Sequence, residues 1–178
     1  MNDIHLKRLT SADSSDHTEL WPLYIQAFPG HERRSLKAHC QALLHPDYYC
    51  MAIFHENHRI GLAWYWKNAE YTYLEHFTIF PECRNRGYGK TVLNLLIQQH
   101  SDLILEVDPP TNAIRRRRIA FYKRQKLYLN YYPYFHRGYG ITPKPHHLML
   151  MTSHHTWPLN QLSKFYQYNF QEIMAIHD

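Results

Sequence analysis

Hydrophobic and polar residues alternate along some segments of the chain and recur every three or four positions along others. Alternation with a period of two is typical of strands, and a period near 3.6 is typical of amphipathic helices. The first pattern predicts strands near residues 4–8, 48–54, 60–66, 71–80, 103–107, 127–132 and 147–151. The second pattern predicts helices near residues 20–28, 36–44, 87–100, 113–125 and 162–173.

Turn-forming residues separate these segments and fix their order. Pro29 and Gly30 end the first predicted helix, and the run Asp108-Pro109-Pro110 ends the strand near residues 103–107. The order is strand, two helices, three strands, helix, strand, helix, two strands and helix, which predicts one mixed α/β domain over residues 1–178. A chain of this length is long enough to bury a sizeable core.

The most distinctive residues lie between the strand predicted near residues 71–80 and the helix predicted near residues 87–100. Residues 84–90 read Arg-Asn-Arg-Gly-Tyr-Gly-Lys. The first amides of a helix have no partner inside the helix and carry partial positive charge. Gly87 and Gly89 let the backbone approach a ligand, since glycine has no Cβ and tolerates positive φ. The loop therefore predicts a pyrophosphate-binding site, with candidate residues Arg84, Asn85, Arg86, Gly87, Tyr88, Gly89 and Lys90.

Two common phosphate-binding loops do not match this segment. No Gly-Lys-Ser/Thr ending follows, which argues against a P-loop, and the Rossmann glycine triplet is absent as well. A turn rich in arginine and glycine before an ordinary helix stays open as the alternative interpretation.

The net charge and the cysteine content limit which classes of partner and which cellular compartment we expect. The net charge of +5 favours an anionic partner, either a nucleic acid or a polyanionic molecule such as coenzyme A. The three cysteines form no C-x-x-C pair, so we expect reduced thiols and a cytoplasmic location. No apolar run approaches the roughly 18 residues of a membrane span, and the N-terminus lacks a signal-peptide core, so we expect no membrane partner.

The histidine pairs do not have the spacing of a metal site. His146-His147 and His154-His155 are adjacent residues, which point to opposite sides of an extended chain. Neither pair has the H-x-x-x-H spacing of a zinc-binding helix or a nearby cysteine pair. The sequence therefore predicts no metal.

Two motifs inside this element order resemble the Gcn5-related N-acetyltransferase (GNAT) superfamily. The first is R-x-x-G-x-G after the fourth strand, and the second is Phe121-Tyr122 late in the helix after the fifth strand. Residues 73–77, 105–110 and 117–122 are similar to a bacterial subgroup of acetyltransferases. The resemblance covers nearly the whole chain. It implies a single-domain acyl-CoA N-acyltransferase fold, in which a mixed, mostly antiparallel seven-stranded sheet flanked by helices is splayed between strands four and five.

The resemblance also implies the reaction and its co-substrate. The protein is expected to be an N-acetyltransferase that transfers an acetyl group from acetyl-CoA to a primary amine by direct attack in a ternary complex. The cofactor would fill the splay like an added strand, bonded by the backbone near Phe77, Thr78 and Ile79. A bulge in the fourth strand would free an N–H to polarise the thioester carbonyl.

The sequence departs from the family pattern at two positions. Arg115 stands where an asparagine is frequent, and its guanidinium group can meet a phosphate of the cofactor instead. Lys126-Leu127 replaces the usual Gly-Phe after the helix that carries Tyr122. Without this glycine, either another residue caps the C-terminus of the helix or the backbone there is strained. Because of both departures, a further hypothesis stays open: a degenerate acyltransferase that binds coenzyme A as a sensor.

Tyr122 is the candidate general acid, a role that its place in the second motif implies. The thiolate of departing coenzyme A needs a proton, and a phenol with a pKa near 10 can supply it. The chain has 15 tyrosines, so a packing role is the alternative.

Glu75 is the leading candidate for the general base. Strand alternation places it on the same face as Tyr73 and Phe77, and a carboxylate among aromatic residues is expected to have a raised pKa. The alternative is a structural ion pair of Glu75 with His76 or an arginine. Glu106 on the fifth strand is the second candidate base, because its side chain can point into the same cleft.

A rival hypothesis is a basic, aromatic-rich nucleic-acid-binding domain without catalysis, suggested by residues 115–118 and 131–136. Four consecutive helical arginines are spread about 100° apart, so at most one or two would reach a shared ligand. This spacing argues against a nucleic-acid partner, and the resemblance to the acetyltransferases implies a small-molecule or peptide amine acceptor. The edges of the sixth and seventh strands could support a homodimer. The acceptor itself is not encoded in any motif of this chain.

Overall fold

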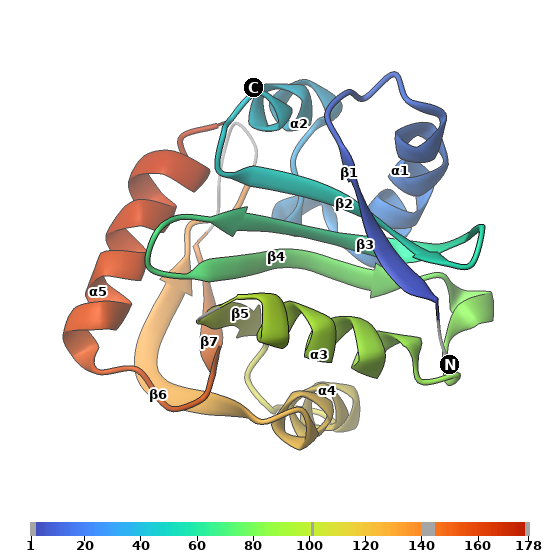
Figure 1. Cartoon of the computed structure of the whole chain (residues 1–178). Coiled ribbons are helices and arrows are strands. Elements are labelled where there is room, and N and C mark those ends of the chain that lie inside the picture. The colour runs from blue at the N-terminus through green and yellow to red at the C-terminus, as the bar shows by residue number, and fades with distance from the viewer. Residues whose placement is uncertain (1–2, 101, 140–144, 177–178) are drawn as a thin grey trace.

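The alternating segments assemble into one sheet of seven strands in the order β1-β2-β3-β4-β5-β7-β6 (Figure 1). The structure is a computed structural model that describes residues 3–100, 102–139 and 145–176. The strands are β1 (Ile4–Leu9), β2 (Tyr48–His55), β3 (His58–Lys67), β4 (Thr72–Ile79), β5 (Leu103–Val107), β6 (Leu127–His136) and β7 (His146–Ser153).

Five α-helices and three short helical turns complete the described chain. The α-helices are α1 (Ser15–Ala27), α2 (Leu36–Leu43), α3 (Tyr88–Gln99), α4 (Ala113–Arg124) and α5 (Leu159–Tyr168). The turns are η1 (Gly30–Glu32), η2 (Pro81–Cys83) and the π-helical turn η3 (Asn169–Ile173). The observed order of strands and α-helices is the order that the periodicity predicts. Among the described residues, no helix has both the length and the apolar character needed to cross a membrane.

Helices cover both faces of the sheet, and each face has its own hydrophobic core (Figure 1). On the first face, α1, α2 and α5 pack against strand residues that include Trp64, Trp66 and Tyr73. On the second face, α3 and α4 pack against Leu74 and Leu105. Burial of these apolar side chains on both sides fixes the position of each strand in the sheet.

One predicted boundary is wrong. The sequence predicts that β6 ends near residue 132 and that Pro133 begins a connection, but the strand continues to His136. The pairing of β6 with β7 is interrupted between Asn130 and Tyr134, which leaves Pro133 inside an irregular stretch. A proline is tolerated there because it has no N–H to donate to the ladder. Part of the predicted connection, residues 140–144, lies outside the described residues.

The parallel strands β4 and β5 diverge after three paired positions. Thr72 pairs with Leu103, and the last pair joins Leu74 to Leu105. Beyond it, β5 continues against β7, whereas β4 pairs on that side with no further strand in the described part of the chain. All other neighbouring strands are antiparallel. The predicted splay between strands four and five is confirmed.

A bulge in β4 lies where the strands begin to diverge. Tyr65 of β3 pairs with Leu74 and Trp64 pairs with His76, so Glu75 is the extra residue. An extra residue breaks the alternation of side chains. Glu75 therefore shares the first face with Tyr73, as predicted, but Phe77 packs on the second face. The prediction that Glu75 and Phe77 share a face is wrong for this reason.

Helix α4 carries Tyr122 and has clear signals at both ends. Asn112 caps the N-terminus of the helix, where its side chain accepts a hydrogen bond from the Arg115 amide at 2.9 Å. Lys126 follows the helix with φ of +62°, in the left-handed region that glycine usually fills. Of the two outcomes expected after this helix, another capping residue or strain, the structure shows Lys126 in the strained conformation.

The close approach of β3 to the free half of β4 gives the first prediction. A Cβ at Gly61 would lie 2.3 Å from the Thr78 carbonyl oxygen, a contact with backbone that cannot be relieved by a side-chain rotation. Gly61→Ala should lower the free energy of unfolding by about 1–3 kcal/mol, measured by urea denaturation. Gly30→Ala is the control, since its Cβ would meet nothing within 4 Å. Equal stability of the two variants would contradict the predicted clash.

Candidate active site

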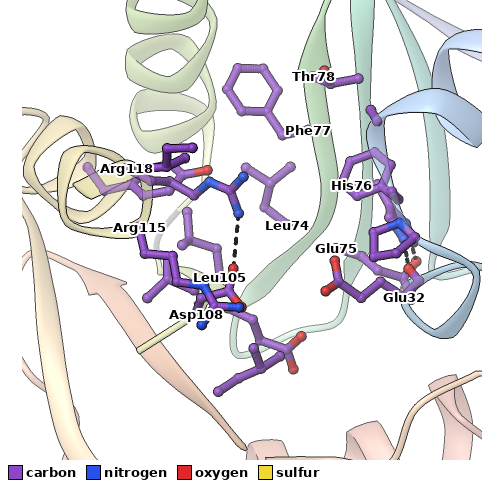
Figure 2. Close-up of a pocket in the computed structure, with 18 of the residues that line it drawn as sticks. Glu32, Leu74, Glu75, His76, Phe77, Thr78, Leu105, Asp108, Arg115 and Arg118 are labelled. Atoms are coloured by element: carbon purple, nitrogen blue, oxygen red, sulfur yellow. Dashed lines mark hydrogen bonds and ion pairs between the residues drawn. The ribbon is translucent and has the colours of Figure 1, made fainter. Parts of the chain in front are cut away.

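A cavity of about 1200 Å³ opens where β4 and β5 diverge. Its walls come from α1, η1, β4, β5, α4, β6 and β7, together with the loop that precedes α3. Figure 2 shows Arg115, Arg118 and Asp108 on one side of this opening and Glu32, Glu75 and His76 on the other. Its volume lies just above the range of about 300 to 1,000 Å³ that is typical of pockets for a single small ligand.

The start of α3 presents unpaired amides near the cavity. Gly87 is the N-cap, with φ of +83°, and no side chain caps the helix. The first backbone bond runs from the Thr91 amide to the Gly87 carbonyl at 3.1 Å, so the amides just before Thr91 have no helical partner. A helix start of this kind attracts phosphate groups. The sequence predicts that Gly87 tolerates a positive φ, and its φ of +83° agrees with that prediction.

The side chains of the predicted phosphate loop do not converge. Arg84 and Gly89 line the cavity, and the Arg84 Nε donates a hydrogen bond to the Ile79 carbonyl at 2.9 Å. The ring of Tyr88 lies 4.8 Å from the ring of His55 on β2, away from the cavity lining. The loop therefore offers mainly its backbone to a ligand. The remaining candidates are exposed and do not line the cavity: Asn85, Arg86, Gly87 and Lys90.

The unpartnered half of β4 forms the floor between these amides and the bulge. Phe77, Thr78 and Ile79 all line the cavity, as expected for a strand edge that receives a ligand. The edge has free backbone groups because β5 pairs only up to Leu74 of β4. A Cβ at Gly89 would lie 3.8–3.9 Å from Ile79, Phe121 and Phe77, so these apolar groups meet beside the loop.

Arginines at the start of α4 flank the cavity. Arg115 binds Asp108 at 3.0 Å, and Arg118 binds the other oxygen of Asp108 at 3.4 Å (Figure 2). Arg117 also lines the cavity, whereas Arg116 bonds the Pro110 carbonyl. Three of the four arginines therefore line the cavity, because a long side chain can carry its guanidinium group sideways from its own position on the helix. That at most one or two of them reach a shared ligand stays a prediction.

Tyr122 faces the same cavity from the last turns of α4. It lines the cavity beside Phe121, with ring centroids 5.3 Å apart. Burial raises the pKa of Tyr122 above its usual value, and the nearby charge of Arg118 partly offsets this. The phenol is therefore fully protonated at neutral pH and can donate a proton.

Glu75 is committed to a buried ion pair. Its Oε2 atom accepts from Arg34 Nη1 at 2.7 Å and from Trp66 Nε1 at 3.0 Å, and its Oε1 atom accepts from the Tyr139 hydroxyl at 2.5 Å. Both charged side chains are 1 % exposed. Burial by itself would raise the pKa of Glu75, but Arg34 and the hydrogen-bond donors outweigh burial and hold the pKa well below its usual range.

The expected raised pKa of Glu75 is therefore wrong. The cause is Arg34, which lies in the loop between η1 and α2 and belongs to no motif that sequence analysis could detect. The alternative considered from the sequence, a structural pair of Glu75 with an arginine, matches the observed geometry. His76 lies beside this pair, with Nδ1 at 3.4 Å from Glu75 Oε2.

Glu106 has the opposite environment. It lines the cavity and accepts a hydrogen bond from the Tyr134 hydroxyl, and its nearest potential cation is His136, with Nε2 at 3.9 Å. Burial raises the pKa of Glu106 to about 7, because no arginine or lysine compensates the charge. Of the two candidate bases, Glu106 is thus the one that can gain and lose a proton near neutral pH.

Sequence analysis missed the partners that set these two environments. Tyr134 belongs to the aromatic run at residues 131–136, which suggests nucleic-acid binding rather than a partner for a carboxyl group. Arg34 and Tyr139 lie in loops without a motif, and no local signal marks them. It also missed a group of potential metal ligands at the same cavity. His31, Glu32 and His146 each offer a ligand atom, and these atoms lie within 4.8 Å of one another.

Comparisons with known proteins agree with this geometry. Residues 15–126 match the Acetyltransferase (GNAT) family. A solved protein from Bacteroides thetaiotaomicron, assigned to the GNAT family of acetyltransferases, has 25 % identity and a TM-score of 0.90, with 97 % of this chain and 99 % of that chain covered. No curated protein matches the sequence.

More distant structures share the fold alone. An acetyltransferase from Elizabethkingia anophelis with acetyl-CoA bound has 13 % identity and a TM-score of 0.56, covering 85 % of this chain and 97 % of that chain. The ribosomal-protein-S18-alanine N-acetyltransferase from Escherichia coli has 18 % identity and a TM-score of 0.57, covering 87 % and 96 %.

The family match spans more than half of the chain, and the solved relative from Bacteroides spans nearly all of it. The expectation of an N-acetyltransferase enzyme is confirmed at this level. With its splayed β4 and β5, its uncapped helix start and this match, the chain belongs to the GNAT family of acetyltransferases.

Proposed function

We propose that this protein transfers the acetyl group of acetyl-CoA to the primary amine of a small-molecule or peptide acceptor, by direct attack within a ternary complex. One observation carries the proposal. A single cavity of about 1200 Å³ is bordered by the free edge of β4 and the loop before α3, and Glu106 lines the same cavity. Both substrates can therefore be held in one space, and no acyl-enzyme intermediate is required.

The free edge of β4 supports the binding of the co-substrate. The amide groups of a pantetheine chain can bond the backbone around Phe77, Thr78 and Ile79, as an added strand would. The amides at the start of α3, with Arg84 and Arg115 nearby, suit the phosphates. A solved structure of the same fold with acetyl-CoA bound adds support.

The reaction requires a neutral amine. An alkylamine with a pKa of roughly 10 costs about 4 kcal/mol to deprotonate at pH 7. Glu106, with a pKa of about 7, accepts this proton directly or through one water. The amine nitrogen then bonds the thioester carbon, while the amide freed by the bulge at Glu75 polarises the carbonyl oxygen. The carbon–sulfur bond breaks, and the Tyr122 hydroxyl protonates the thiolate. The extra proton on the attacking nitrogen passes through water to the Tyr122 phenolate, which restores the phenol and leaves a neutral amide.

Glu106 rather than Glu75 takes the role of base in this proposal. Both oxygens of Glu75 are occupied by donors, and its pKa is held low, so it binds a proton poorly. Its function is to hold the bulge in position. This reverses the ranking that strand alternation gives from the sequence.

We also propose a cytoplasmic location and no nucleic-acid partner. Cys40, Cys50 and Cys83 are free thiols, as expected in a reducing compartment. Arg118 is paired with Asp108 and Arg116 bonds the Pro110 carbonyl, which leaves less free positive charge for a nucleic-acid backbone. A homodimer through the β6 edge of the sheet stays a prediction. The predicted β7 edge is wrong, because β7 lies between β5 and β6.

Tyr122→Phe tests the general acid. Turnover with acetyl-CoA and the best acceptor from a panel of primary amines should fall roughly 10²- to 10⁴-fold, because the thiolate loses its proton donor. The Kd for acetyl-CoA, measured by calorimetry, should be nearly unchanged. Tyr128→Phe is the control, since Tyr128 is 44 % exposed on β6 and should keep full activity. Equal turnover of Tyr122→Phe and the wild-type protein would remove Tyr122 from the mechanism.

Glu106→Gln tests the general base through the pH dependence of kcat/KM. In the wild-type protein this ratio should rise through about pH 7, as Glu106 loses its proton and becomes able to accept one. The variant should lose this rise and fall roughly 10²- to 10⁴-fold in turnover at pH 8. A variant that keeps the rise near pH 7 would show that another group is the base.

Glu75→Gln tests the structural role assigned to Glu75. Removal of one partner leaves Arg34 buried without a countercharge, so the free energy of unfolding at pH 7 should fall by about 3–5 kcal/mol. Because the pKa of Glu75 is lowered by folding, the deficit should shrink as pH falls below about 4.3, where the unfolded wild-type chain binds the proton.

Glu70→Gln is the matched control for this measurement. Glu70 pairs with Lys164 at 3.3 Å, but both side chains are more than half exposed. A surface pair of this kind contributes about 0–1 kcal/mol. If both variants unfold at the same denaturant concentration, the buried pair does not have the assigned role.

A further inference from the structure

Three side chains from distant parts of the sequence meet at the wall of the cavity. His31 and Glu32 lie on η1, between α1 and α2, and His146 begins β7. The Nε2 atom of His31 is 3.5 Å from Glu32 Oε1, and the rings of His31 and His146 are 5.3 Å apart and nearly perpendicular. One ligand atom from each residue lies within 4.8 Å of the other two.

The backbone of this group is held in place by neighbouring elements. The His31 carbonyl accepts a hydrogen bond from the Tyr139 amide at 3.2 Å. The Glu32 carbonyl lies 2.8 Å from His76 Nε2, which therefore carries the proton (Figure 2). Both residues are thus anchored by their main chains, while their side chains, 56 % and 32 % exposed, are free to turn.

His146 is unusual among the three. Both of its ring nitrogens are buried, and neither has a hydrogen-bond partner among the described residues. Its ring lies between those of His31 and His136, whose centroids are 5.3 and 5.2 Å away. A buried imidazole with two unsatisfied nitrogens is costly, and such a group in a folded protein commonly indicates a water or an ion.

We propose that His31, Glu32 and His146 form a binding site for a divalent transition-metal ion of the zinc class. Two imidazoles and one carboxylate are ligands that Zn²⁺ prefers, whereas Mg²⁺ and Ca²⁺ prefer oxygen atoms alone. Ligand atoms around tetrahedral zinc lie about 3.4 Å apart, given bonds of about 2.1 Å. The group reaches this spacing when the exposed His31 and the half-buried Glu32 side chains close on His146, by at most about 1.4 Å from the observed limit of 4.8 Å.

The site has consequences for the cavity but is separate from acetyl transfer. Three protein ligands leave one position of a tetrahedral ion open, and all three residues line the cavity. An ion there would offer a Lewis-acidic position at the wall of the space that Glu106 also lines. The proposed transfer reaction uses no metal, so the two proposals stand or fall independently.

Zinc binding by the full chain tests the site without any measurement of activity. Tag-free protein is stripped with EDTA, dialysed and titrated with Zn²⁺ by calorimetry, and Co²⁺ is added in parallel to record the visible absorption of a tetrahedral ion. We expect one saturable equivalent and a rise in Tm with Zn²⁺. His31→Ala, Glu32→Gln and His146→Ala should each weaken binding by about tenfold or more, since even outer-shell changes cost 10- to 100-fold.

His147→Ala is the matched control. His147 is the next residue of β7, and its ring packs on Phe135 rather than on the proposed ligands. This variant should bind Zn²⁺ as the wild-type protein does. Equal losses in His147→Ala and in the three ligand variants would show dispersed binding to a chain with 15 histidines, and would overturn the proposal. The absence of a saturable equivalent would overturn it as well.

Two of the ligand variants keep the test decisive if His146→Ala fails to fold. His31 and Glu32 lie on a one-turn helix with no buried residues, so His31→Ala and Glu32→Gln should fold normally, as checked by circular dichroism. Binding of Zn²⁺ by both at wild-type affinity would contradict the site. Acetyl-CoA is left out of these titrations, so their failure would leave the proposed transferase reaction untouched.

Discussion

The ion pair between Arg34 and Glu75 is the interaction on which the geometry of the site depends. The Arg34 amide donates to the Tyr24 hydroxyl at 2.8 Å, and its guanidinium group bonds Glu75 and the Ile173 carbonyl. Glu75 in turn accepts from Trp66 and Tyr139. The pair therefore joins α1, β3, the bulge of β4, the segment after β6 and the C-terminal turn η3. A buried pair with so many donors holds its partners in one arrangement.

This pair also divides the chemistry between two carboxylates. Glu75 and Glu106 line the same cavity, but one has an arginine beside it and the other has only hydroxyl and imidazole neighbours. The pKa of Glu75 is held low and that of Glu106 is raised to about 7. Two carboxyl groups whose environments separate their pKa values can take different roles. In this protein one is structural and the other is the proposed base.

The divergence of β4 and β5 supplies the second constraint. Once pairing ends at Leu74, the backbone of β4 has unpaired groups that must be satisfied by water or by a ligand. The start of α3 leaves further amides unpaired next to the same opening. Members of the GNAT family share this architecture, and the high TM-score to the Bacteroides relative extends the likeness over nearly the whole chain.

Local sequence patterns were enough to predict the order of the elements, the position of the loop before α3 and the unusual helix end at Lys126, because each of these features depends on neighbouring residues. Periodicity records which face of a segment is buried, and glycine or proline marks where a segment ends. Only the tertiary structure could show that Phe77 packs on the face opposite Glu75, since a bulge depends on the register of the partner strand. The tertiary structure also sets the pKa values of Glu75 and Glu106 and places His146 beside His31 and Glu32. Burial and charge around a residue depend on segments that lie far apart in the sequence.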